Sequence, residues 1–169
     1  MPEKNLIVDG KEINYEGVFD LNKLLRTFDQ LFAEKGYARK EKKREEKVTS
    51  DGKEFFIELR PVKPMAAYYV HNIVIKIYAT DVKDVFVNIH GRKLKIHEGK
   101  VRIVFNSWEL TDYWLRWEQT AWYSLLKGFF EKFFFNLGST KHMMLLKTET
   151  DYIYNNIKAH LNLYKFIVK

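Results

Sequence analysis

The chain has 169 residues and no cysteine; 46% of its residues are hydrophobic, 16% are aromatic, and the net charge is +7. This length and composition predict one folded domain and exclude a disordered chain, while the lack of cysteine excludes disulfides, thiolate catalysis, cysteine-ligated zinc and iron–sulfur clusters. The positive charge predicts an affinity for anions, and the absence of cysteine and of a long apolar run near residue 1 favours a cytoplasmic protein.

The first elements are expected to be a hairpin and a helix. Asn5–Val8 and Glu12–Tyr15 alternate in polarity around Asp9-Gly10, which is a strong two-residue turn signal. Asp20 then suits the N-cap of a helix that runs to about Lys35. Its apolar residues form one stripe, so we expect the helix to cover one side of a sheet: Leu21, Leu24, Leu25, Phe28, Leu31 and Phe32.

A charged stretch and a strand follow. Ala38–Thr49 is nearly all charged and precedes the turn signal Ser50-Asp51-Gly52, so it is interpreted as a solvated edge strand paired with Glu54–Val62. A helix is the competing interpretation, because Lys, Glu and Arg are good helix formers. Pro61 and Pro64 are expected to interrupt the sheet and form a loop.

The middle of the chain predicts a central strand and a meander. Ala67–Thr80 carries apolar residues on both faces, which is typical of a covered central strand or of a dimer contact. Asp81–Asp84 is expected to be a turn. Three further strands are then predicted, with turns at Gly91 and Gly99: Val85–Ile89, Lys93–His97 and Lys100–Leu110.

The stretch Lys100–Leu137 predicts a strand that leads into a strongly apolar helix ending at Gly138-Ser139. Half of the helix surface is apolar: Trp122, Tyr123, Leu125, Leu126, Phe129, Phe130, Phe133, Phe134 and Leu137. These side chains are interpreted as core, with a cavity lining and a membrane-surface helix as alternatives. Lys127, Glu131 and Lys132 argue against a membrane span.

The last thirty residues predict an amphipathic helix. Thr148–Asp151 resembles a capping box. The helix that follows this cap has five residues on one face: Ile153, Tyr154, Ile157, Leu161 and Tyr164. The predicted organisation is therefore one domain over residues 1–140 and a helical extension over residues 141–169, packed on that domain or on a partner.

Together these elements predict an α+β fold with a curved antiparallel sheet of about six to eight strands, a long apolar helix packed on it and an extra C-terminal helix. Over Glu12–Leu137 the order is similar to that of helix-grip (START-like) domains. The resemblance implies a sheet wrapped around a long helix, with an apolar cavity between them.

Catalytic and metal signatures are absent from the sequence. The five histidines do not fall at metal-ligand spacing, and no Gly-rich phosphate loop is present. Ser107 lacks a Gly-x-Ser-x-Gly elbow, and the carboxylates Glu109, Asp112 and Glu118 are interpreted as capping or structural groups. No cofactor is expected, and nothing positive indicates an enzyme.

Three functions remain open. The first is a non-enzymatic domain that binds a lipid or another apolar small molecule, lined by Trp122, Leu126, Phe129 and Phe133 of the helix and by Val101, Ile103 and Phe105 of the strand. The second is a basic adaptor that contacts nucleic acid or an acidic protein through Lys93, Lys95, Lys100 and Arg102. The third is a homodimer formed through Tyr68, Val70, Val74 and Phe135, or through the tail helix.

Overall fold

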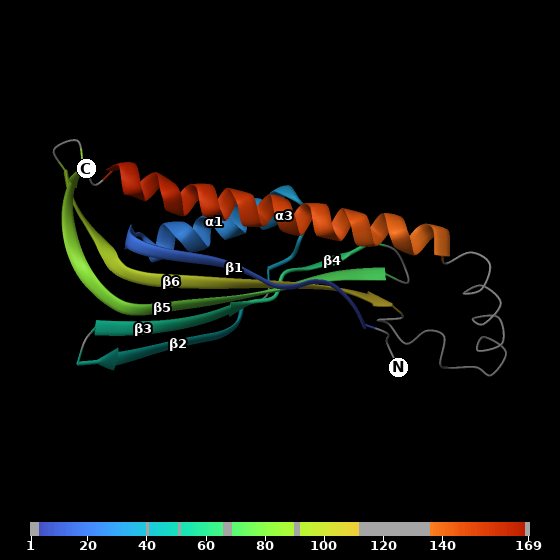
Figure 1. Ribbon diagram of the computed structural model, residues 1–169, viewed down its shortest axis with the longest axis horizontal. Helices are drawn as coiled ribbons and strands as arrows, with labels where there is room; N and C mark the ends of the chain where they lie inside the picture. Colours follow the sequence, from blue (N-terminus) through green and yellow to red (C-terminus); the bar gives the residue numbers. More distant parts are fainter. Residues whose placement is uncertain are drawn as a thin grey trace.

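The computed structural model describes residues 4–39, 41–50, 52–65, 69–89, 92–111 and 136–167. Within them one six-stranded antiparallel sheet carries two helices on the same face (Figure 1). The predicted α+β class, antiparallel sheet and C-terminal helix are confirmed. The strands run in the order β1 (Lys4–Phe19), β6 (Arg92–Thr111), β5 (Tyr69–Ile89), β3 (Gly52–Leu59) and β2 (Glu41–Thr49), with β4 (Val62–Pro64) pairing to β5.

Helix α1 (Leu21–Glu34) forms as predicted. The Asp20 side chain accepts a hydrogen bond from the Lys23 backbone N–H at 3.0 Å, which is the N-cap interaction that starts the helix. All six residues of the predicted stripe are buried against the sheet.

The predicted N-terminal hairpin is wrong. Residues 4–19 form the single strand β1, which pairs along its length with β6. Gly10 has φ +59°, and the register shifts between Val8 and Lys11. The Asp9-Gly10 turn signal therefore marks a bulge inside the strand, where the Gly10 N–H bonds the Asn106 side chain at 2.7 Å.

The expected turns at Asp81–Asp84 and at Gly99 are also wrong, because β5 and β6 each run through them. Asp81 has φ +55°, and the β5–β6 register shifts between Thr80 and Lys83. A Cβ on Gly99 would lie 2.8 Å from the Thr80 carbonyl oxygen, so the two strands approach too closely there for a side chain. Beyond this bulge, and past the end of β1, the sheet continues as a two-stranded extension, Val85–Ile89 paired with Arg92–Ile96, which we call the distal arm and which curves away from the sheet (Figure 1).

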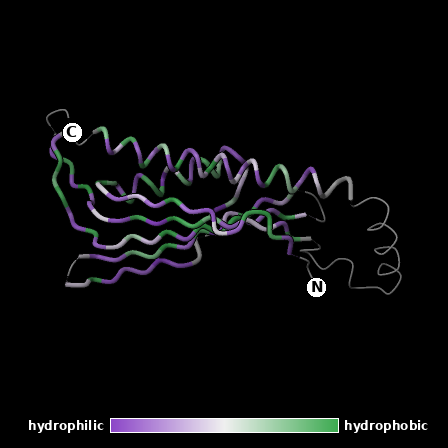
Figure 2. The backbone as a smooth tube through the Cα atoms, viewed as in Figure 1, coloured by the Kyte–Doolittle hydropathy of each residue, from purple (hydrophilic) through white to green (hydrophobic). Residues whose placement is uncertain are grey.

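Strand β2 is an edge strand, as predicted. It is hydrophilic along most of its length (Figure 2), and the side chains from Lys43 to Val48 are all exposed. The expectation that Pro61 and Pro64 mark a plain loop is wrong in part, because Val62–Pro64 pairs with Val70–Asn72 of β5.

Helix α3 (Asn136–Ile167) is longer than the predicted tail helix. The backbone at Gly138 and Ser139 is helical, so the stop expected there is wrong. Thr148 is not a cap either, because it lies inside the helix and its hydroxyl donates to the Met144 carbonyl at 2.9 Å. The apolar helix predicted before it falls mostly in residues 112–135, outside the described residues.

One hydrophobic core joins α1, α3 and the inner face of the sheet. Phe105 of β6 lies at its centre, with its ring centroid 6.2 Å from Phe28 of α1 and 5.6 Å from Tyr154 of α3. Ile153, Ile157 and Leu161 of the predicted tail face are buried in the same core. Since burying one large apolar side chain is worth roughly 1.5–3 kcal/mol, this seam between helices and sheet stabilises the fold.

Candidate functional site

The sheet presents two faces with different chemistry. Its inner face forms the seam with α1 and α3, and it includes the predicted ligand-lining residues Val101, Ile103 and Phe105, all fully buried in the core. The predicted helix-side residues Trp122, Leu126, Phe129 and Phe133 lie outside the described residues. Figure 1 shows both described helices on this inner face.

At one end of the seam the inner face changes from apolar to polar. The inward positions of β6 continue from Phe105 to Ser107 and Glu109, and those of β5 continue from Ile73 to His71. Register places His71 opposite Glu109, with Ser107 one inward position away. All three residues are fully buried. Within the described part of the chain, neither ring nitrogen of His71 nor the Ser107 hydroxyl has a hydrogen-bond partner, which is uncommon for buried polar groups.

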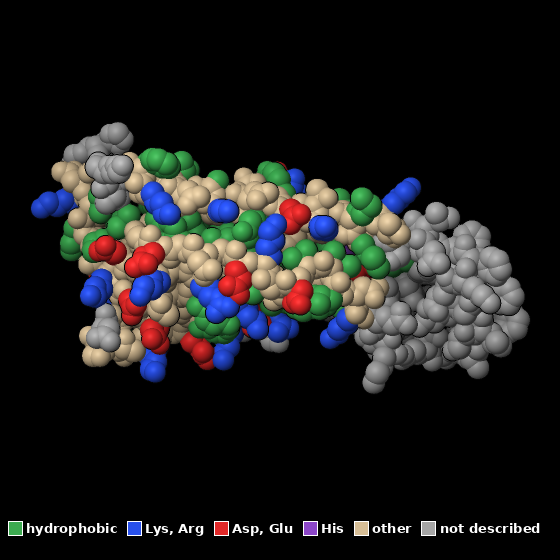
Figure 3. Space-filling model, viewed as in Figure 1, with side chains coloured by type: hydrophobic (Ala, Val, Ile, Leu, Met, Phe, Trp, Pro, Cys, Tyr) green, Lys and Arg blue, Asp and Glu red, His purple; other side chains and the backbone are tan. Residues whose placement is uncertain are grey.

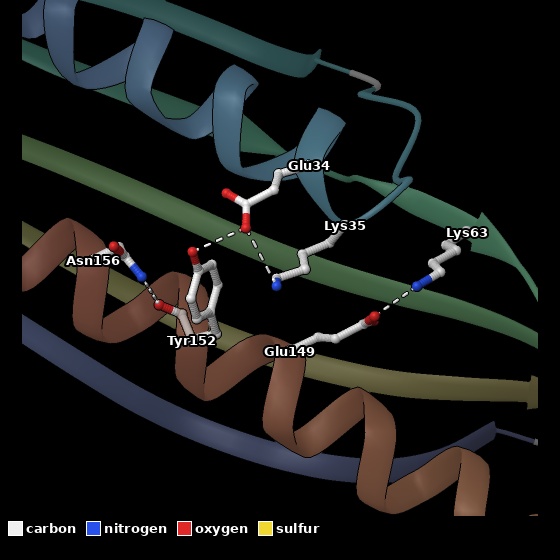
Figure 4. A network of polar contacts seen from close by, with 6 residues as sticks. All are labelled: Glu34, Lys35, Lys63, Glu149, Tyr152 and Asn156. Carbon is white, nitrogen blue, oxygen red and sulfur yellow. Dashed lines mark hydrogen bonds and ion pairs between the residues drawn. The ribbon is translucent and has the colours of Figure 1, made fainter.

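Helix α3 covers this polar end with two residues. The His142 ring lies edge-on to His71 with centroids 6.2 Å apart. Glu149 accepts hydrogen bonds from the Tyr37 hydroxyl at 2.7 Å and from Lys63 Nζ at 2.6 Å. One turn on, the Tyr152 hydroxyl donates to Glu34, which also pairs with Lys35 (Figure 4). These contacts fix α3 against β4 and the end of α1.

Burial governs protonation at the polar end of the seam. Desolvation lowers the pKa of His71 to about 4, and it outweighs the opposing effect of the Glu149 charge. His71 is therefore neutral at pH 7 and offers one hydrogen-bond donor and one acceptor. Among the described residues no group of three or more His, Asp or Glu side chains is arranged to hold a metal ion.

The outer face of the sheet carries no described helix and contains two neighbouring hollows, which we call the outer groove. The larger, of about 570 Å³, lies over the middle of β1, β6 and β5, and the smaller, of about 320 Å³, lies toward β4. Five cationic residues line the two hollows: Lys4, Arg60, Lys76, Lys100 and Arg102.

Strand alternation places these cations on the outer face. Lys100 and Arg102 occupy successive outward positions of β6, while Val101 and Ile103 between and beyond them point into the core. Tyr78 of β5 is 36% exposed and lies opposite Arg102 in the register. Phe56 of β3 lies opposite Tyr78, with ring centroids 5.1 Å apart.

Several groove cations already face carboxylates. Arg102 donates two hydrogen bonds to Glu12, at 3.1 and 2.5 Å, and this contact holds the pKa of Glu12 below its ordinary value. Lys100 lies 3.2 Å from Asp81, and Arg60 lies 2.6 Å from Glu58. Lys4 and Lys76 form no salt bridge within the described part of the chain. Figure 3 shows the same mixture of charges on the face in view.

The four predicted anion-contact residues separate into two places. Lys100 and Arg102 lie together in the outer groove, whereas Lys93 and Lys95 lie on the distal arm, opposite Asn88 and Phe86. Lys95 also pairs with Asp84 at 2.9 Å. The sequence pattern did not single out Lys4, Arg60, Lys76, Tyr78 and Phe56 as a group, because only the strand order brings them together.

Two other predicted sets, the dimer residues and the carboxylate trio, lie only partly within the described residues. Of the dimer residues, Val70 and Val74 lie on outward positions of β5 and are buried, and Tyr68 and Phe135 lie outside the described residues. Of the carboxylate trio, Glu109 is at the polar end of the seam, and Asp112 and Glu118 are not described. No helix among residues 4–39 and 136–167 is long and apolar enough to cross a membrane.

Comparison with known proteins gives no relative: no family model, curated protein or solved structure matches the chain.

Proposed function

We propose that this protein is a basic, non-enzymatic adaptor that binds a polyanionic partner through the outer groove. The observation that carries the proposal is the convergence of five cationic side chains from separate parts of the chain on two neighbouring hollows, on a sheet face without a described helix. The net charge of +7 would steer an anionic partner toward the protein.

The existing ion pairs are compatible with this role. Exposed salt bridges contribute little free energy, because water and salt screen them. A phosphate or carboxylate of a partner can therefore take the place of Glu12 or Asp81 beside Arg102 and Lys100 at little cost. Meanwhile these acids keep the cations extended over the groove.

Charge reversal tests the proposal. The double variant Lys100→Glu/Arg102→Glu is compared with wild type for binding of fluorescently labelled inorganic polyphosphate, at several salt concentrations. Wild type is expected to bind with an affinity that falls as salt rises, and the variant with a much lower affinity and a weaker salt dependence.

The distal arm supplies a matched control, because Lys93→Glu/Lys95→Glu changes the net charge equally at a different place. This control is expected to retain most of the binding. Equal losses in the two double variants would show that net charge alone attracts the probe, and would contradict a site in the outer groove.

A second proposal keeps the seam as a small-molecule site. It is supported by the buried nitrogens of His71 and hydroxyl of Ser107, which have no hydrogen-bond partner among the described residues, and by the similarity of the element order predicted from the sequence to that of helix-grip domains. A ligand with a polar end beside these three atoms and an apolar remainder would give them hydrogen-bond partners. Native mass spectrometry of the purified protein should then show a retained molecule that His71→Phe/Ser107→Ala loses. A wild-type mass equal to that of the bare chain would contradict this proposal.

A further inference from the structure

A row of side chains crosses the outer face at the larger hollow, where Asn14, Arg102 and Tyr78 line the hollow and Phe56 packs beside Tyr78. The registers of neighbouring strands place Phe56 opposite Tyr78, Tyr78 opposite Arg102, and Arg102 opposite Asn14. These outward residues lie on β3, β5, β6 and β1, so two aromatic rings and a guanidinium form a continuous line across the sheet.

Cations flank this row on both sides along the strands. Lys76 precedes Tyr78 by two residues on β5, and Lys100 precedes Arg102 by two residues on β6. Because β5 and β6 are antiparallel, the two lysines lie on opposite sides of the row, each about 7 Å away along its strand. An aromatic platform therefore has a positive charge on either side.

We infer that the polyanion bound in the outer groove is a single-stranded nucleic acid, with a base stacked on the Tyr78–Phe56 platform and the flanking phosphates held by Lys76, Lys100 and Arg102. This inference rests on the proposed polyanion site and specifies its ligand. Base–aromatic stacking beside a cationic track is the usual mode of sequence-tolerant binding to single strands.

Other anionic partners would contact the cations of the outer groove but not the aromatic rings. Duplex DNA or RNA keeps its bases stacked inside the helix and presents phosphates, so it has no free base face for Tyr78. An acidic protein segment would pair with the three cations and would gain little from the ring of Tyr78. The aromatic row is therefore the feature that selects unpaired bases among polyanions.

Removing one ring tests the inference. Tyr78→Leu keeps an apolar side chain but no stacking surface, and Phe86→Leu on the distal arm is the matched control because that ring is also exposed. Fluorescence anisotropy is measured with labelled oligothymidylate of 20 nucleotides, a labelled duplex of 20 base pairs, labelled polyglutamate and labelled polyphosphate. Thermal unfolding followed by circular dichroism verifies that each variant is folded.

Wild type is expected to bind the oligothymidylate more tightly than the duplex or polyglutamate. Tyr78→Leu should weaken oligothymidylate binding by about tenfold and leave polyphosphate binding unchanged, while Phe86→Leu changes neither. Phe56→Leu provides a second test on the same platform and should give a loss in the same direction.

Two results would overturn the inference while polyphosphate binding persists. One is wild-type affinity for oligothymidylate in both Tyr78→Leu and Phe56→Leu. The other is wild-type protein that binds polyglutamate or the duplex as tightly as oligothymidylate, or more tightly. Absence of polyphosphate binding by wild type would instead remove the proposed function itself, so the two failures are distinguishable.

Discussion

The Tyr37 hydroxyl, at the end of the turn after α1, donates a 2.7 Å hydrogen bond to Glu149 of α3, which lies 112 residues later in the chain. Lys63 binds the other oxygen of the same carboxylate at 2.6 Å. Burial and the neighbouring Glu149 charge both raise the pKa of Tyr37, so its hydroxyl stays protonated as a donor. One carboxylate thus joins three distant segments at the polar end of the seam.

The first prediction concerns this carboxylate. Glu149→Gln removes the charge that pairs with Lys63, whose side chain is mostly buried, and leaves the ammonium group without compensation. We expect the free energy of unfolding to fall by about 3 kcal/mol, measured by urea denaturation at pH 7.

Glu45→Gln is the matched control, since Glu45 pairs with Lys43 at 2.8 Å on the exposed strand β2. It is expected to leave the urea midpoint unchanged. Equal effects of the two substitutions would mean that the Glu149 contact contributes no more than a surface ion pair.

The second prediction concerns packing in the middle of the seam. Phe105 is fully buried between Phe28 and Tyr154, whereas Phe86 is 71% exposed on the distal arm. Phe105→Ala should lower the free energy of unfolding by about 3–5 kcal/mol, because a cavity remains where the ring was. Phe86→Ala should have little effect. If Phe105→Ala were tolerated as well as Phe86→Ala, the middle of the seam would have to contain space already.

The third prediction is a pH dependence of stability that depends on His71. Its pKa is about 4 in the folded protein and near 6.5 in the unfolded chain, so the unfolded chain binds the extra proton. The contribution of neutral His71 is complete above pH 6.5 and is lost as the pH falls toward 4, by about 1.4 kcal/mol for each pH unit. Burial also lowers the pKa of His160, which adds a slope of the same sign.

Urea denaturation of wild type and His71→Phe at pH 7, 6, 5 and 4.5 measures how much of the pH dependence of the free energy of unfolding comes from His71. The variant should lose less stability than wild type between pH 6.5 and 4.5, because only its other groups titrate. Parallel curves for the two proteins would show that His71 is not kept neutral by folding.

The fourth prediction concerns the start of α1. Asp20→Ala removes the acceptor for the Lys23 backbone N–H and should destabilise the protein by about 1 kcal/mol in thermal or urea unfolding. Asp20→Asn keeps an equivalent acceptor and should remain close to wild type. A loss in Asp20→Asn as large as in Asp20→Ala would assign the effect to charge and not to capping.

Local signals predicted the elements whose causes are local. Helix α1 has its cap, its apolar stripe and its terminating Gly36 within one short stretch, and it forms as expected. The charged edge strand β2 also follows from its own composition. In both cases the deciding interactions lie within about 15 residues of the chain.

Turn signals were misleading where distant pairing decides the structure. Gly10 and Asp81 adopt positive φ angles, as turn residues do, but they lie in bulges because a partner strand continues past them. Gly99 is required by the carbonyl of Thr80, on another strand. The outer groove was predicted only through Lys100 and Arg102, since adjacency on one strand is visible in a sequence and register between strands is not.

The pairing of β1 with β6 joins the beginning of the described chain to its later part, with the Gly10 N–H and the Asn106 side chain in contact across 96 residues. Such a large contact order slows folding, because a long segment must lose its freedom before the first strand gains a partner. On the ribosome, β1 and the apolar side of α1 would remain without the neighbour that covers them until β6 has emerged. Nascent chains are therefore expected to need protection by a chaperone until β6 has been synthesised.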